Sequence, residues 1–132
     1  MKIAISAAET SGDMIGAALV KALIDLNPDC QIEGLAGEMM SNEGCHRLWN
    51  MDHANVMGFS EVLKKLPSLL RLRSSIVTHF TKSRPDVFIG VDSPDFNFKI
   101  ERKLKQNGIK TVHFISPSVW AWRSNRITKI KA

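Results

Sequence analysis

Short apolar runs alternate along this chain with longer stretches in which apolar residues recur at helical spacing. This alternation limits the fold more than any other feature, because strands that alternate with helices build βαβ units with a parallel sheet. The runs of strand length lie at residues 2–8, 30–36, 86–91 and 109–115. Their nearly continuous apolar character is typical of strands buried on both faces. We therefore expect an α/β fold, a Rossmann-like parallel sheet flanked by helices.

Between these runs the pattern predicts helices, which lie at residues 14–26, 38–43, 59–83 and 95–107. Gly108 follows the last of them at the position where a glycine commonly ends a helix. Pro67 is expected to begin a new helix, because a proline fits the first turn better than a helix interior. Residues 45–58 have no clear pattern.

The length of 132 residues suits one domain, because a core of this size buries roughly two-thirds of the unfolded surface. Charge is unevenly distributed along it. Residues 1–62 carry three bases and nine acids, whereas residues 63–132 carry fifteen bases and four acids. The second half is expected to attract an anion, which can be a phosphorylated substrate, an anionic membrane surface or a nucleic acid.

No run of about 18 apolar residues occurs, so the sequence predicts no transmembrane helix. The first apolar run stops at Glu9, which is too early for a signal peptide, and a cytoplasmic location is expected. Cys30 and Cys45 lie far apart, without a second cysteine or a histidine cluster at metal-binding spacing. Two reduced structural thiols are therefore expected, and no metal site.

The turn after the first strand reads ETSGD and spans residues 9–13. Thr10 or Ser11 can cap the helix that follows, and Gly12 allows a ligand to approach the backbone. The turn lacks the GxGxxG of dinucleotide-binding proteins and the GxxxxGKS/T of P-loops, so no nicotinamide, ATP or other cofactor is expected. A purely structural turn and a ligand-binding turn both fit these residues.

A second polar turn follows the most apolar strand. Asp95 can cap the next helix, whereas Asp92, at the strand end before Ser93 and Pro94, has no comparable structural role. A carboxylate at that position can accept a proton from a substrate hydroxyl as a general base. Asp92 is therefore the candidate catalytic residue.

A third polar stretch, SPSVWAWR at residues 116–123, follows the last strand. Its two tryptophans can stack on sugar rings, lie at a lipid interface or pack in the core, and the sequence leaves these roles open. His113 lies within the strand itself, where a buried structural histidine is expected rather than a catalytic one.

Together these stretches resemble the lipid-A-disaccharide synthases, a family of membrane-associated glycosyltransferases. The resemblance runs in family order from about residue 2 to residue 131, and VMG and EVL within residues 55–63 add to it. It implies a GT-B enzyme with two Rossmann-like halves. Residues 1–132 are then the N-terminal, acceptor-side domain, and the C-terminal nucleotide-binding domain is absent, so the chain is expected to be inactive alone.

The resemblance also implies the reaction. It is the transfer of 2,3-diacylglucosamine from UDP to the 6-hydroxyl of 2,3-diacylglucosamine 1-phosphate, with inversion at the anomeric carbon. Asp92 is then the base that takes the proton of the acceptor hydroxyl. The residues expected to shape the acceptor side of the cleft are Glu9, Ser11, Gly12, Asp13, Asp95 and Asn97.

Three positions depart from the family pattern. Ala8 stands where a glycine is usual, Ser93 stands where an alanine is common, and GEMM at residues 37–40 replaces a Gly-Pro-Arg-Met-like stretch. The last change removes a base near the cleft, so a phosphate contact at that position is not carried over.

Acylated substrates imply contact with a membrane, here the anionic cytoplasmic face of the inner membrane. Residues 59–82 combine apolar residues with bases and fit a helix in the interface, although a helix that merely covers the sheet fits as well. The residues expected at the membrane are Lys64, Lys65, Leu69, Leu70, Arg71 and Arg73.

Two other classes of function remain as alternatives. A nucleic-acid-binding module is not expected, because most bases are dispersed on helices rather than interleaved with aromatic residues. A non-catalytic Rossmann-like domain that binds an anionic ligand is the second alternative. The sequence pattern does not indicate which oligomeric state the protein adopts.

Overall fold

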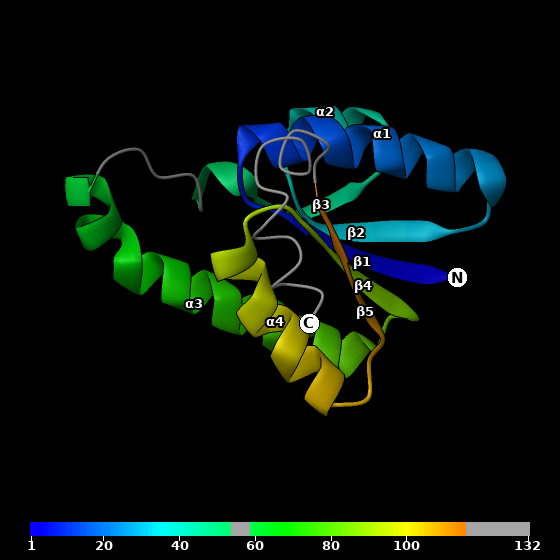
Figure 1. The fold of residues 1–132 in the computed structure, drawn as a ribbon. Coiled ribbons are helices and arrows are strands. Elements are labelled where there is room, and N and C mark those ends of the chain that lie inside the picture. Colours follow the sequence, from blue (N-terminus) through cyan, green and yellow to red (C-terminus); the bar gives the residue numbers. More distant parts are fainter. Residues whose placement is uncertain (54–58, 116–132) are drawn as a thin grey trace, which may run out of the picture.

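The computed structural model describes residues 1–53 and 59–115 (Figure 1). Within these residues one sheet has five parallel strands in the order β3-β2-β1-β4-β5. The strands are β1 (Lys2–Ala7), β2 (Gln31–Ala36), β3 (His46–Asn50), β4 (Val87–Val91) and β5 (Thr111–Phe114). The helices are α1 (Thr10–Leu26), α2 (Glu38–Asn42), α3 (Phe59–Ser83) and α4 (Pro94–Gln106), with a 3-10 turn η1 (Met51–His53). The predicted Rossmann-like α/β fold is confirmed, with the strand order reversing between β1 and β4.

Helices cover both faces of the sheet, α1 and α2 on one side and α3 and α4 on the other (Figure 1). Side chains of β1 point alternately to the two faces, so Ile5 joins the α1 and α2 core while Ala4 joins the α3 and α4 core. Phe80 of α3 and Phe88 of β4 are fully buried in the latter core, with ring centroids 6.0 Å apart. Burial on both faces explains why β1, β2 and β4 read as nearly continuous apolar runs.

The strand β3 lies in the segment that the sequence left unassigned. It is one of the two edge strands of the described sheet, and its first two residues, His46 and Arg47, are exposed. Only Leu48 and Trp49 pack against the core. A short edge strand with so few inward-facing apolar residues has no strand periodicity that a sequence pattern can detect.

The helix α3 is continuous through Pro67, so the prediction that Pro67 begins a new helix is wrong. A proline in a helix interior costs about 3 kcal/mol. Burial of Leu72, Ile76 and Phe80 further along the helix offsets this cost. At 25 residues α3 is about 37 Å long, about twice the length of β4, and its N-terminal part projects past the sheet on the side where the strands end (Figure 1).

The helix starts also differ from the predicted ones. Glu9 is the N-cap residue of α1, and no side chain bonds to the first turn, so capping by Thr10 or Ser11 is wrong. The N-cap of α4 is Ser93, which places Asp95 inside the first turn, where its charge favours the helix dipole without capping. The predicted end of α4 is confirmed, because Gly108 has a left-handed φ of 83° and donates its N–H to the Lys105 carbonyl at 3.0 Å.

Across residues 1–53 and 59–115, no helix is both long enough and apolar enough to cross a bilayer.

Candidate functional site

The turns that follow β1 and β4 lie together at the point where the strand order reverses. The two strands are neighbours, and Ala7 pairs with Val91 at their carboxyl ends. A pocket of about 220 Å³ opens there, lined by Ala8, Glu9, Leu69, Ser93, Pro94, Asp95 and Phe96. The structure thus brings together two of the three predicted polar stretches. The third, at residues 116–123, lies outside the described residues.

The second of these turns is strained. Asp92 and Ser93 both have left-handed backbones, with φ values of 48° and 41°. A left-handed residue other than glycine costs roughly 1–2 kcal/mol, and such residues concentrate where function requires a particular geometry. The Asp92 N–H donates to the Phe114 carbonyl at 2.9 Å, which ties the turn to β5. Asp92 itself is partly exposed.

Asn97 fixes the strained turn through hydrogen bonds from its buried side chain. Its Nδ2 donates to the carbonyl oxygens of Asp92 at 2.9 Å, Val91 at 3.2 Å and Ser6 at 3.2 Å. The side chain is fully buried, so it joins the ends of β4 and β1 rather than facing the pocket opening. The sequence placed Asn97 at the site, but its role as a clamp on three carbonyls depends on the neighbouring strand and was not predictable.

Asp13 points to α2. Its side chain is 4% exposed and accepts N–H donors from Gly37 and Met40 on Oδ1, at 3.1 and 3.0 Å, and from Met39 on Oδ2 at 3.1 Å. Since Gly37 has no side chain to cap α2, Asp13 caps that helix from α1. This role was missed because the partners lie at least 24 residues away in the sequence.

The remaining residues of the first turn divide between its surface and its interior. Glu9 and Ser11 are exposed beside the pocket, and Asp95 is exposed across it. Gly12 is buried, and a Cβ atom there would lie 3.4 Å from both the Ala7 Cβ and the Val91 carbonyl oxygen. A Cβ atom at this position would therefore make ordinary van der Waals contacts with β1 and β4.

Two titratable side chains outside this pocket have structural partners. His113 bonds through Nδ1 to Glu101 Oε2 at 2.8 Å, and the two side chains are only 12% and 11% exposed.

Cys30 and Cys45 are free thiols. Burial, followed by the nearby carboxylates of Asp13 and Glu33, raises the pKa of the Cys45 thiol to about 12. Among the described residues, no three His, Cys, Asp or Glu side chains cluster as metal ligands.

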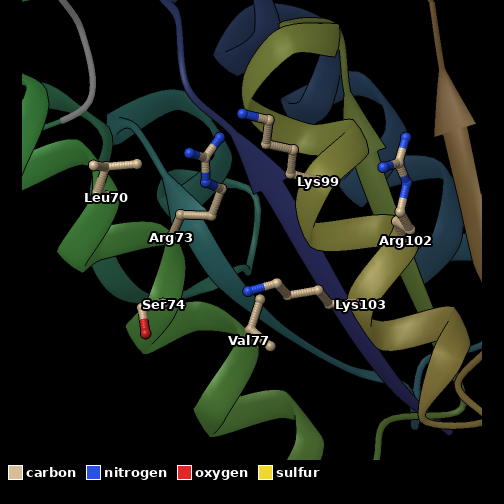
Figure 2. Close-up of a pocket in the computed structure, with 7 residues that line it drawn as sticks. All are labelled: Leu70, Arg73, Ser74, Val77, Lys99, Arg102 and Lys103. Carbon is tan, nitrogen blue, oxygen red and sulfur yellow. The ribbon is translucent and has the colours of Figure 1, made fainter.

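The residues predicted to meet a membrane lie on α3, and the four of them whose side chains the structure describes do not share one face. Leu70 and Arg71 are exposed, whereas Leu69 packs against the core and lines the 220 Å³ pocket. Arg73 lies over the Phe96 ring, with its Cζ 5.9 Å from the ring centroid. Leu70 and Arg73 also line a second pocket, between α3 and α4 (Figure 2). Lys64 and Lys65 lie in the first half of the α3 sequence, ahead of Arg71 and Arg73.

Comparison with known proteins agrees with the resemblance of these motifs. The family model of the lipid-A-disaccharide synthetases matches residues 3–132. Proteins named lipid-A-disaccharide synthase from Photobacterium profundum and Pseudoalteromonas translucida are 51% and 52% identical over 132 residues, which is all of this chain and 35% and 34% of theirs. One from Haemophilus influenzae is 51% identical over 128 residues, 97% of this chain and 33% of the relative. The chain spans about a third of the length of these curated relatives, and it belongs to the lipid-A-disaccharide synthetase family.

Proposed function

We propose that the chain is the N-terminal, acceptor-side half of a GT-B glycosyltransferase of lipid A biosynthesis. The reaction joins the 2,3-diacylglucosamine unit of a UDP-sugar to 2,3-diacylglucosamine 1-phosphate, and releases UDP. The observation that carries this proposal is the strained Asp92–Ser93 turn beside a pocket at the reversal point of the sheet. Ligands of doubly wound sheets bind at this point.

In the proposed reaction the acceptor 6-hydroxyl oxygen attacks the anomeric carbon of the donor. The bond from that carbon to the UDP oxygen breaks as the new glycosidic bond forms on the opposite face, which inverts the configuration. The hydroxyl proton passes to the Asp92 carboxylate, which acts as general base. UDP leaves with the bonding electron pair and needs no protonation at its phosphate near neutral pH.

The acceptor is bound by groups on both turns. Glu9, Ser11 and Asp95 are exposed around the pocket and can bond to sugar hydroxyls. Asp13 and Asn97 act on the acceptor by fixing the shape of the turns through their buried hydrogen bonds. Gly12 is buried as well and acts as part of the first turn. In this proposal Asp13 and Asn97 are positioning residues.

In this proposal the contacts to UDP lie in a C-terminal nucleotide-binding domain, for which the remaining length of the curated relatives leaves room. The test is a chimera in which this chain replaces the matching N-terminal third of the Photobacterium profundum relative. The chimera should form disaccharide 1-phosphate and UDP from the two substrates, as followed by mass spectrometry. A folded chimera that binds UDP but forms no disaccharide would contradict the proposal.

The enzyme also has to reach acylated substrates, and we propose that α3 contacts an anionic membrane surface. The N-terminal part of this helix projects past the strand ends, and Leu66 and Leu70 expose their side chains. Lys64, Lys65, Arg71 and Arg73 supply positive charge, each worth about 1 kcal/mol near an anionic surface. Reversing these four charges should abolish sedimentation with anionic vesicles. Unchanged binding would show that α3 only covers the sheet.

A further inference from the structure

A second pocket lies between α3 and α4, with a volume of about 290 Å³. One wall is α3, which contributes Leu70, Arg73, Ser74 and Val77. The facing wall is α4, which contributes Lys99, Arg102 and Lys103. Four of these seven residues are cationic and none is acidic, although acids make up almost half of the charged residues in the chain. Such a pocket selects an anion.

Three of the cations extend into the gap between the two helices. Arg73 and Lys99 reach toward the gap from the two facing helices, and the Lys103 ammonium extends across it toward Val77 (Figure 2). The Arg102 guanidinium points away from this gap. The ion pairs found in the described residues both involve histidines, so none of them neutralises these three cations.

The α3 wall has a different character. Leu70 is 47% exposed, and Val77 lies two turns further along the same helix. Between them, the Ser74 hydroxyl adds a hydrogen-bond donor. An anionic group held by the three cations would therefore have apolar surface on one side. This combination fits a phosphate attached to an acylated molecule better than a free inorganic anion or a nucleic acid, which offer no acyl chain to the leucine.

The basic pocket adjoins the pocket at the strand ends. Arg73 lines the former and lies over the ring of Phe96, which lines the latter. Leu69 and Leu70 are consecutive residues of α3 and line one pocket each. A lipid whose phosphate is bound between α3 and α4 would thus lie beside the Asp92 turn.

We propose that the pocket between α3 and α4 binds the phosphate monoester of an acylated lipid, through Arg73, Lys99 and Lys103. A monoester carries more charge than a diester at neutral pH, which suits a pocket lined by several cations. Two lipids present this group, the glycolipid acceptor and a membrane phosphatidate. Binding of the glycolipid acceptor in this pocket rests on the proposed function, whereas binding of a phosphatidate does not.

The first experiment measures vesicle binding of the 132-residue chain. The double variant Lys99→Gln/Lys103→Gln removes two charges from the pocket. The control Lys105→Gln/Lys110→Gln removes two charges from exposed positions outside it. Vesicles of phosphatidylcholine contain either phosphatidic acid or phosphatidylglycerol at equal surface charge. We expect the pocket variant to bind phosphatidic acid vesicles about tenfold more weakly than the control variant, and the two variants to bind phosphatidylglycerol vesicles alike.

The second experiment measures acceptor kinetics with the same variants in the chimera. If the acceptor is the source, the pocket variant raises the acceptor KM about tenfold while kcat stays within about twofold. A selective loss on phosphatidic acid vesicles with an unchanged KM assigns the site to a membrane lipid. If neither vesicle selectivity nor KM separates the pocket variant from its control, the proposed site is wrong. An inactive wild-type chimera would count against the proposed function, and the vesicle result would still decide the pocket.

Discussion

Replacing Asp13 with alanine tests how the ETSGD turn is built. The carboxylate is almost fully buried and accepts three backbone N–H groups at 3.0–3.1 Å. A hydrogen bond to a charged group contributes about 1.5–3 kcal/mol, and removal of one partner of a buried network leaves the others unsatisfied. Because the three bonds share one carboxylate, we expect a combined loss of about 3–5 kcal/mol rather than their sum. That loss is a large fraction of the 5–15 kcal/mol that stabilises a typical domain.

Urea unfolding followed by far-UV circular dichroism measures this loss, with Asp25→Ala as the control. Asp25 is an exposed aspartate on the same helix, and its replacement should change the free energy of unfolding by less than about 0.5 kcal/mol. Amide hydrogen exchange should also accelerate at Met39 and Met40, whose donors lose their acceptor. A loss below about 1 kcal/mol for Asp13→Ala would refute the capping role and return Asp13 to the set of direct acceptor contacts.

Three further changes follow from the packing. Gly34→Ala should destabilise the fold by about 3 kcal/mol or more in urea unfolding, because its Cβ atom would lie 1.8 Å from the Ile5 carbonyl oxygen; a smaller loss would mean that β1 and β2 can separate. Asn97→Asp should destabilise more than Asn97→Ala, since a carboxylate oxygen would face three carbonyl oxygens within 3.2 Å, and the reverse order of melting temperatures would contradict the clamp. The pKa of the Cys45 thiol is about 12 in the folded protein, against an ordinary value of 9.0. The unfolded state therefore loses the thiol proton first, and the free energy of unfolding falls as pH rises from 9 to 12, by up to about 1.4 kcal/mol per pH unit. Cys45→Ala should remove that contribution and Cys30→Ala should not, as urea unfolding at several pH values will measure.

Much of the fold was predictable from sequence because its interior strands are buried on both faces. The runs that became β1, β2, β4 and β5 are apolar enough to be recognised without any partner. The strand β3 was missed because its exposed residues His46 and Arg47 leave no apolar run of strand length, whereas β5, at the other edge of the described sheet, has such a run. The path of α3 through Pro67 was missed for a different reason, since local propensity was overridden by packing of the distant Phe80.

The site was predictable in its position but less so in its parts. Polar residues after β1 and β4 had to meet if the sheet was parallel, and they do. Which of them face the pocket depends on contacts between elements. Asp13 turns to the start of α2 and Asn97 to the end of β1, and neither partner is near in the sequence. The basic pocket was likewise hidden, because its cations come from two helices whose pairing no local pattern specifies.

The kinetics of Asp92→Asn in the chimera test whether Asp92 acts as the base at the strand ends. The change keeps the size of the side chain and removes its ability to accept the proton. We expect kcat to fall by about 10²–10⁴, with the acceptor KM within a few fold of wild type and Asp25→Asn unchanged. Turnover near that of wild type would show that Asp92 is not the base and would favour a domain that binds its ligand without catalysis.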